Sequence, residues 1–268
     1  MADSRKSPTD LGVSKPLVPP LYQSSVYTLP DLDALDRIYD AGEPGFIYAR
    51  DAHPNARQLA AALAAAEGGA WAAVTGSGMA AISAILLATV EKGGRVVASN
   101  RLYGRTTQLL HQELARFGVQ TTFVDANDQG AVARALETPA RLLFVETVSN
   151  PLLRVADVDA LGRLAHDRGS LFVVDNTFAS PALCRPLERG ADLVMESLTK
   201  MIGGHSDVTL GAVIGRGDLQ AEVAQVISIW GLASNPFDCW LAERGLATLA
   251  LRMRAASANA AALADWLA

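Results

Sequence analysis

The chain has 268 residues, of which half are apolar, and a formal net charge of −5. This length and apolar content suffice to bury the core of one large domain or two small ones. The acidic balance, without a run of lysines or arginines, argues against nucleic acid or an acidic membrane as the main partner, so we expect a small-molecule ligand. The first residues lack the apolar core of a signal peptide, and no apolar segment is long enough to span a bilayer.

The two cysteines, Cys184 and Cys239, are too few for a disulfide framework or a cysteine-rich metal site. They fit a reducing compartment, so a cytoplasmic location is expected. A core position is the expected role for both.

Residues 1–47 contain six prolines and show helical periodicity only over residues 32–39. Proline-rich segments without sustained periodicity are typical of extended structure. We therefore expect an extended N-terminal arm that precedes the globular part of the chain.

From residue 55 onward, helical patterns alternate with short β-branched or apolar runs, which is typical of an α/β domain with a mostly parallel sheet. The runs that predict strands are residues 70–75, 95–99, 121–124, 141–145, 171–174, 192–195 and 209–214. Candidate helices include residues 56–67, 78–90, 106–117 and 157–167.

Residues 236–268 look helical almost without interruption and have no glycine or proline terminator at their end. A long helix with nothing after it leaves part of its apolar face uncovered. We therefore expect this helix to lead into a C-terminal domain that lies outside the chain.

Polar residues gather where the predicted strands end, which is where ligands bind in open α/β sheets. Asp175 follows the run Leu-Phe-Val-Val, and Lys200 closes the sequence Ser-Leu-Thr-Lys. A lysine that forms a Schiff base and a carboxylate that pairs with a pyridinium nitrogen are the two groups that a pyridoxal 5'-phosphate (PLP) enzyme needs. Ser197 and Thr199, two residues apart, could hold a phosphate. The simpler alternatives are an acid that caps a turn and a surface lysine.

The segment Thr75-Gly-Ser-Gly-Met-Ala-Ala81 lies between a predicted strand and a predicted helix. The free N–H groups of Gly78 and Met79 could therefore bind phosphate at a helix N-terminus. The segment also matches the dinucleotide-binding pattern Gly-x-Gly-x-x-Ala. That pattern requires an acid about 20 residues later, where this chain has Ala98-Ser-Asn100. Because this acid is absent there, NAD binding is disfavoured.

Two other basic residues allow more than one interpretation. His205 could be a ligand or a base, but no pair among the four histidines has zinc-ligand spacing, so we favour a packing or hydrogen-bonding role. Arg50, in Tyr48-Ala-Arg, could be an ordinary surface cation or could donate two hydrogen bonds to a phosphate. The spacing alone does not decide between them.

Together these residues resemble the Cys/Met-metabolism family of PLP enzymes, which includes cystathionine γ-synthase, cystathionine lyases, methionine γ-lyase and the O-acyl-homoserine sulfhydrylases. The resemblance extends from about residue 22 to residue 268. The motifs that carry it are Tyr48-x-Arg50, Gly76-Ser-Gly-Met-Ala-Ala81, Tyr103-Gly104, Glu146-Thr-Val-Ser-Asn-Pro151, Asp175-Asn-Thr-Phe178, Ser197-Leu-Thr-Lys200 with Gly204-His-Ser-Asp207, and Asn235-Pro-Phe-Asp238 before Arg244-Gly-Leu246.

The resemblance implies the large domain of an aspartate aminotransferase-like PLP enzyme of fold type I, with a mostly parallel sheet flanked by helices. The chain then divides into an arm (1–47), a PLP-binding large domain (48–235) and a long helix (236–268) that leads into the C-terminal domain. The implied catalytic residues are Lys200, which forms the Schiff base and moves protons, Tyr103, which stacks on the ring, and Asp175, which keeps the pyridine nitrogen protonated.

Further residues are implied to bind the cofactor. Asn150 would lie near the ring hydroxyl and Thr177 beneath the ring. In the family the Tyr48-x-Arg50 motif completes the phosphate site of a neighbouring subunit, so a dimer or tetramer is expected. The complete implied set is Tyr48, Arg50, Gly78, Met79, Tyr103, Asn150, Asp175, Thr177, Ser197, Thr199 and Lys200.

The resemblance implies an enzyme of trans-sulfuration, and we favour a carbon–sulfur lyase that acts by β- or γ-elimination on cystathionine- or methionine-like substrates. One alternative is a γ-replacement synthase or sulfhydrylase that acts on O-acyl-homoserine. Another alternative is a homologue that binds PLP without turnover. In the family the C-terminal domain supplies the arginine that binds the substrate carboxylate, and we expect that domain to lie outside this chain. The chain departs from the usual family residues at His53, Asn55, Arg105, Val148 and Met201.

Overall fold

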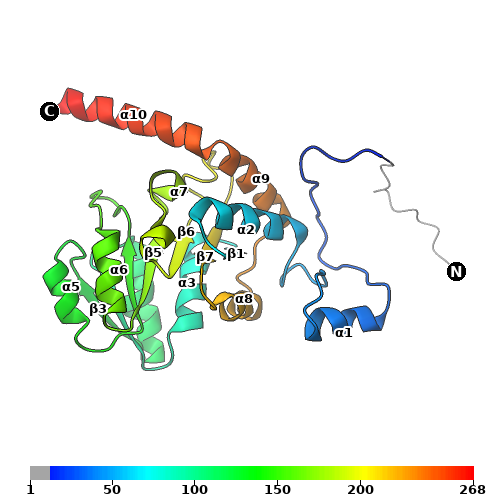
Figure 1. Ribbon diagram of the computed structural model, residues 1–268, viewed down its shortest axis with the longest axis horizontal. Coiled ribbons are helices and arrows are strands. Elements are labelled where there is room, and N and C mark those ends of the chain that lie inside the picture. The colour runs from blue at the N-terminus through cyan, green and yellow to red at the C-terminus, as the bar shows by residue number, and fades with distance from the viewer. Residues whose placement is uncertain (1–12) are drawn as a thin grey trace.

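The computed structural model describes residues 13–268, and a seven-stranded sheet forms its centre (Figure 1). The strand order is β1-β7-β6-β5-β4-β2-β3; β7 runs antiparallel to both of its neighbours, and the other pairs are parallel. The strands are β1 (Trp71–Thr75), β2 (Arg95–Ser99), β3 (Gln120–Val124), β4 (Leu142–Glu146), β5 (Leu171–Asp175), β6 (Leu193–Glu196) and β7 (Gly211–Gly215).

Helices cover both faces of the sheet, and alternate residues of each strand pack into one of two apolar clusters. The first cluster lies under α2 (Pro54–Glu67), α5 (Gln129–Ala135), α6 (Val158–His166) and α9 (Pro236–Ala247). The second lies under α3 (Gly78–Thr89), α4 (Gly104–Gln108) with the segments that continue it, and α8 (Gln220–Ile229). This arrangement confirms the predicted α/β class with a mostly parallel, helix-flanked sheet.

The predicted strands all occur, with their ends displaced by no more than two residues. The helix predicted over residues 106–117 begins as α4 and continues as a π-helical turn (Leu109–Glu113) and a 3₁₀ turn (Leu114–Phe117). Short helices also follow β5, at α7 (Ser180–Leu183) and at a 3₁₀ turn (Pro186–Arg189).

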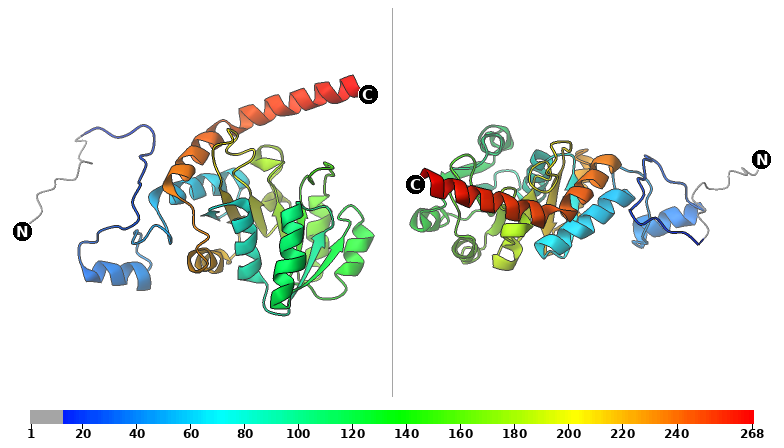
Figure 2. Two further views of the ribbon diagram at one scale, coloured as in Figure 1. Left: turned by 180° about the vertical axis from the view of Figure 1, so that it is seen from behind. Right: turned by 90° about the horizontal axis from the view of Figure 1, so that it is seen from above.

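The helical segment predicted for residues 236–268 is interrupted once, because α9 ends at Ala247 and α10 (Leu249–Leu267) begins after Thr248. The Thr248 hydroxyl and backbone N–H both donate to the carbonyl of Gly245, and this local bonding competes with the helical pattern. α10 extends away from the sheet at one end of the molecule (Figure 2). Within residues 13–268, no helix combines the length and apolar character required to cross a membrane.

The arm lies at the opposite end of the molecule from the tip of α10 (Figure 1). It contains the helix predicted near residues 32–39, which is α1 (Leu32–Asp40); residues 1–12 of the predicted arm lie outside the described part. Asn55 holds the arm against α2, since its side chain accepts from the N–H of Tyr22 and donates to the carbonyl of Pro20. Asn55, one of the positions that depart from the family pattern, therefore makes a contact with the arm.

The two cysteines differ in burial. Cys239 is fully buried in α9, as predicted, but Cys184 is only half-buried, which contradicts the expected core position. Cys184 follows the short helix α7 in a connection that runs along the surface, and both thiols are free.

Candidate active site

A cavity of about 340 Å³ opens beside the carboxyl ends of β4, β5 and β6. It brings together all of the predicted cofactor-binding residues except Tyr48 and Arg50. The predicted residues that line it are Gly78, Met79, Tyr103, Asn150, Asp175, Thr177, Ser197, Thr199 and Lys200. Further lining residues, which the sequence analysis did not assign to the site, are Ser77, Ile82, Glu146, Val148, Phe178 and Met195.

Asp175 is the last residue of β5 and lies buried in the wall of the cavity. Its Oδ1 accepts a hydrogen bond from the N–H of Thr177 at 3.0 Å, and the Thr177 hydroxyl accepts one from the N–H of Ser197 at 2.9 Å. These bonds tie the turn after β5 to the turn after β6. Burial raises the pKa of Asp175 to about 6, because desolvation disfavours the charged carboxylate.

Glu146 is a site residue that the sequence analysis quoted in a motif but gave no role. Its two oxygens accept from the N–H groups of Tyr103, at 2.6 Å, and Asn150, at 3.2 Å, so one carboxylate positions two predicted site residues. Burial, followed by the negative charge of Asp175, raises the pKa of Glu146 to about 7. Its place at the end of a strand run next to β5 was the signal available in the sequence.

The N-terminus of α3 forms one end of the cavity. The Ser77 hydroxyl accepts from the N–H of Ala80 at 3.1 Å and caps the helix. The N–H groups of Gly78 and Met79 belong to the first turn, whose donors have no partner within a helix. A side chain on Gly78 would place Cβ only 2.8 Å from Cβ of Ser197, so glycine allows this close approach.

Ser197 and Thr199 differ in how their hydroxyl groups are used. Ser197 faces Gly78, whereas the Thr199 hydroxyl exchanges hydrogen bonds with the backbone N–H and carbonyl of Leu210, both at 3.2 Å. Thr199 therefore fixes the segment that leads into β7 while it also lines the cavity.

Lys200 is exposed and lines both the main cavity and a larger opening of about 780 Å³ next to α10. Arg252 of α10 also lines this opening. Its guanidinium donates to the carbonyls of Met201, Ile202 and Gly245, so it braces the backbone after Lys200.

Tyr48, Arg50 and His205 lie outside the main cavity. The Arg50 guanidinium lies 5.1 Å from the centre of the Tyr48 ring, and Arg50 lines a separate cavity of about 230 Å³ between the arm, α2 and α8. His205 is exposed and its Nδ1 lies 2.7 Å from the carbonyl oxygen of Gly203, which confirms the predicted hydrogen-bonding role. Within residues 13–268 there is no cluster of three or more histidine, cysteine, aspartate or glutamate side chains that could hold a metal ion.

The chemistry of the cavity fits PLP. Two buried carboxyl groups, Asp175 and Glu146, line it with raised pKa values, and a bound cation such as a pyridinium nitrogen would stabilise a carboxylate there. Unpaired helix donors at Gly78 and Met79 suit a phosphate, and Lys200 supplies a primary amine.

Comparisons with known proteins agree with this chemistry. The sequence profile of the family described as "Cys/Met metabolism PLP-dependent enzyme" matches residues 5–268. Cystathionine gamma-synthase of Mycobacterium tuberculosis is 44% identical over 250 residues, which cover 93% of this chain and 63% of that protein. L-methionine gamma-lyase of Porphyromonas gingivalis is 38% identical over 254 residues, which cover 94% of this chain and 64% of that protein.

A solved structure shows the same fold. Cystathionine gamma synthase from Xanthomonas oryzae pv. oryzae, in complex with aminoacrylate and cysteine, matches with a TM-score of 0.87 at 37% identity, over 93% of this chain and 63% of that chain. The chain therefore spans a little under two thirds of the length of these relatives. The matched profile, the shared fold and the cavity together show that the chain belongs to the Cys/Met metabolism family of PLP-dependent enzymes.

Proposed function

We propose that the cavity binds PLP and that the protein is a carbon–sulfur lyase of trans-sulfuration, which eliminates a substituent at Cβ or Cγ of a cystathionine- or methionine-like amino acid. The observation that carries the proposal is that Asp175, Lys200 and the N-terminus of α3 meet in one cavity. When bound, PLP supplies an electron sink for charge that develops at Cα of the substrate.

The residues of the cavity divide the work of binding and proton transfer. Lys200 would hold the cofactor through its amine and, when free, would carry protons between Cα of the substrate and the carbons beyond it. Asp175 pairs with the ring nitrogen and keeps its proton in place. Gly78, Met79 and Ser197 bind the phosphate, with Thr199 beside them.

The remaining cavity residues orient the ring. Tyr103 would stack on the ring and could exchange a proton at the substrate, Asn150 would lie near the ring hydroxyl, and Thr177 would support the ring. Glu146 holds the backbone of Tyr103 and Asn150, so it keeps these two groups at fixed positions.

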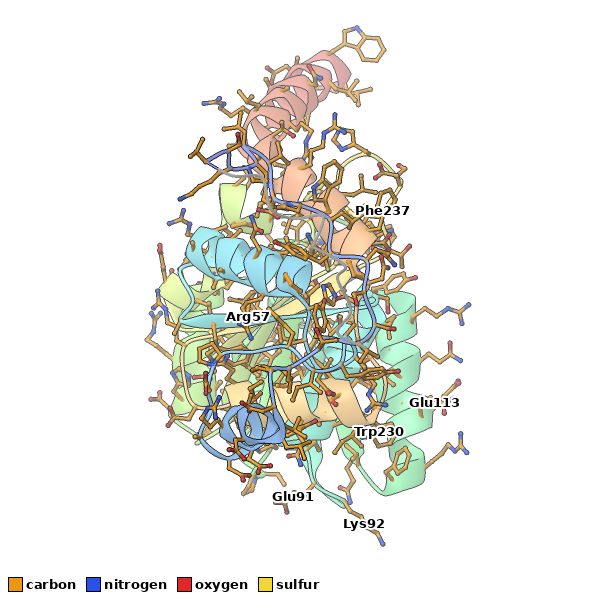
Figure 3. All side chains as sticks on the ribbon, turned by 90° about the vertical axis from the view of Figure 1, so that its right-hand side faces the viewer. Arg57, Glu91, Lys92, Glu113, Trp230 and Phe237 are labelled. Atoms are coloured by element: carbon orange, nitrogen blue, oxygen red, sulfur yellow. The ribbon has the colours of Figure 1, made fainter. Side chains whose placement is uncertain are left out.

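A second copy of the chain completes the site in this proposal, through Tyr48 and Arg50. An apolar surface supports such contact: the side chains of Phe117, Ile229 and Trp230 are 53%, 72% and 56% exposed. Trp230 and Phe117 also line a hollow of about 190 Å³, and Figure 3 shows Trp230 and Glu113, another lining residue, on the face turned toward the viewer. Patches of this kind mark interaction sites.

A mixing experiment tests the shared site. In a homodimer of Arg50→Ala or of Lys200→Ala chains, both sites lack one of the two residues. In a mixed dimer, one site combines the Lys200 of the first variant with the Arg50 of the second and is intact. We expect the unfolded and co-refolded mixture to recover PLP binding that neither variant shows alone. A mixture no better than its parts would place Arg50 outside the partner's site.

The lyase proposal is tested with purified protein, PLP and cystathionine. Release of pyruvate or 2-oxobutyrate without added thiol supports elimination. The 44% identity to a cystathionine gamma-synthase favours a second candidate, replacement at Cγ of an O-acylated homoserine. Product formed only when a thiol and the acylated homoserine are both present would establish that candidate, and PLP binding without any product would leave a cofactor-binding homologue.

The domain division stays a proposal as well. We assign residues 1–47 to the arm, 48–235 to the PLP-binding domain and 236–268 to the helices that follow it. The cytoplasmic location predicted from two unpaired cysteines remains a prediction of the same kind.

A further inference from the structure

Two glutamates, Glu67 and Glu196, lie fully buried on the face of the sheet opposite the cavity. Side chains alternate along a strand, so Met195 of β6 lines the cavity while Glu196 points to the other face. In the same way Asp175 of β5 lines the cavity and the next residue, Asn176, points to the side of α2. The pair therefore lies directly behind the turn that holds Asp175.

In the part of the chain that the structure describes, most of the carboxyl oxygens of Glu67 and Glu196 have no hydrogen-bond donor. The Asn176 side chain donates to Oε1 of Glu67 and to the carbonyl of Cys184, both at 2.9 Å. Within residues 13–268, Oε2 of Glu67 and both carboxyl oxygens of Glu196 are buried without a donor. The two carboxyl groups lie within hydrogen-bond reach of each other, and a proton between them pairs one oxygen of Glu67 with one oxygen of Glu196.

The charges that face the pair show where a remaining negative charge is best placed. Glu67 faces the positive charge of Arg185 and, with a smaller effect, the negative charge of Glu188, which pairs with Arg185 at 3.3 Å. Arg216 donates to the carbonyl of the adjacent Gly68. Glu196 instead faces Asp175. A charge on Glu67 is therefore partly compensated, whereas a charge on Glu196 would repel Asp175.

We propose that Glu67 and Glu196 share one proton, and that the pair acts as a positioning device that keeps a second negative charge away from Asp175. Asn176 links the device to the turn after β5. The shared proton rests on the complete burial of both carboxyl groups and on their oxygens without donors in the described residues. The benefit to Asp175 rests on the proposed function, because it matters only where Asp175 pairs with a pyridinium nitrogen.

The titration behaviour agrees with this geometry. Burial, the largest cause, raises the pKa of both glutamates, and the charge of Glu67 raises the pKa of Glu196 further. Two buried carboxyl groups within hydrogen-bond reach of each other cannot both be ionised without a large cost in free energy.

Three variants distinguish the shared proton itself from its effect on Asp175. Glu196→Gln and Glu67→Gln both replace one carboxyl group by an amide that can donate to the other. Glu196→Gln leaves the charge on Glu67, next to Arg185, whereas Glu67→Gln leaves it on Glu196, next to Asp175. Glu137→Gln is the matched control, since Glu137 is exposed and is not among the charges that face the pair.

The first measurement is denaturant unfolding of the 268-residue chain without PLP between pH 6 and pH 8. The folded pair keeps a proton that the unfolded chain has released, so the unfolding constant of the wild type rises with pH. We expect the unfolding constant of the wild type to rise up to about tenfold more per pH unit than that of Glu196→Gln or Glu67→Gln, and Glu137→Gln to behave like the wild type. Equal slopes in all four proteins would overturn the shared proton.

The second measurement is PLP loading, followed by visible absorption from pH 5 to pH 8. We expect the pH midpoint of loading to rise by about one unit in Glu67→Gln and to stay unchanged in Glu196→Gln. Equal midpoints would overturn the effect on Asp175. A wild-type chain that never binds PLP would overturn the proposed function instead, and the unfolding data would still test the shared proton.

Infrared spectroscopy of the wild type covers the case in which a variant fails to fold. A protonated carboxyl band in the folded chain at pH 8, lost on unfolding, supports the shared proton. The absence of this band in the folded chain would overturn it.

Discussion

Both faces of the sheet carry buried acids, with Asp175 and Glu146 at the ends of β5 and β4 and Glu196 and Glu67 at the ends of β6 and α2, but the two pairs are used differently. Asp175 and Glu146 face a cavity that also holds an amine and free helix donors. Glu67 and Glu196 face a sealed interior with Asn176 as the one donor to them among the described residues. The difference teaches that one step along a β-strand decides whether an acid meets a ligand or must be neutralised inside the protein.

The loss of Lys200 should have the largest effect on the cavity face. In Lys200→Ala no amine remains there to bond to the cofactor aldehyde, so we expect no PLP absorption to survive removal of excess cofactor by gel filtration. Lys92→Ala is the control, since Lys92 lies on the surface, where Figure 3 shows it at the edge of the molecule. PLP retained equally by Lys200→Ala would show that another lysine forms the bond.

The pH dependence of stability should also reveal the cavity acids. The folded-state pKa values of Asp175, about 6, and Glu146, about 7, lie above those of the unfolded chain, so their contribution is complete below about pH 4 and is lost as pH rises to about 7. Without PLP we expect each acid to lower the free energy of unfolding by up to about 3 kcal/mol across this window, at about 1.4 kcal/mol per pKa unit.

Thermal or denaturant unfolding from pH 4 to pH 8, with and without PLP, checks this dependence. Bound PLP should flatten the profile, because its pyridinium nitrogen stabilises the ionised Asp175. An identical pH profile with saturating PLP would contradict a direct contact between Asp175 and the cofactor.

Asp175→Asn tests that contact with little change of shape. A hydrogen bond to a charged group contributes about 1.5–3 kcal/mol, so we expect PLP to bind roughly 10- to 100-fold more weakly, as measured by absorption titration. Asp218→Asn, at an exposed position after β7, should bind PLP like the wild type. Equal affinities in the two variants would assign the ring nitrogen to a different residue.

Local patterns predicted the strands and most of the cavity residues, whereas Tyr103 followed only from the family resemblance. Buried parallel strands read as continuous apolar runs, and site residues follow these runs. The role of Glu146 depends on two backbone N–H groups from distant segments, and the partnership of Glu67 with Glu196 joins residues more than 100 positions apart. The break at Thr248 was missed because helical periodicity continues across it, while Gly245 packs against the backbone of Gly203.

The smallest effect is expected at the N-terminus of α3, where the cavity face depends on a helix cap. Ser77→Ala removes the hydroxyl that accepts from the N–H of Ala80, which should lower the free energy of unfolding by about 1 kcal/mol. Asp128→Ala removes the equivalent cap of α5 and should cost a similar amount. Denaturant unfolding measures both costs. Because α3 presents its first turn to the cavity and α5 does not, PLP affinity should fall a few-fold in Ser77→Ala and not in Asp128→Ala. Equal affinities in both variants would mean that the phosphate is held by Ser197 and its neighbours without the helix N-terminus.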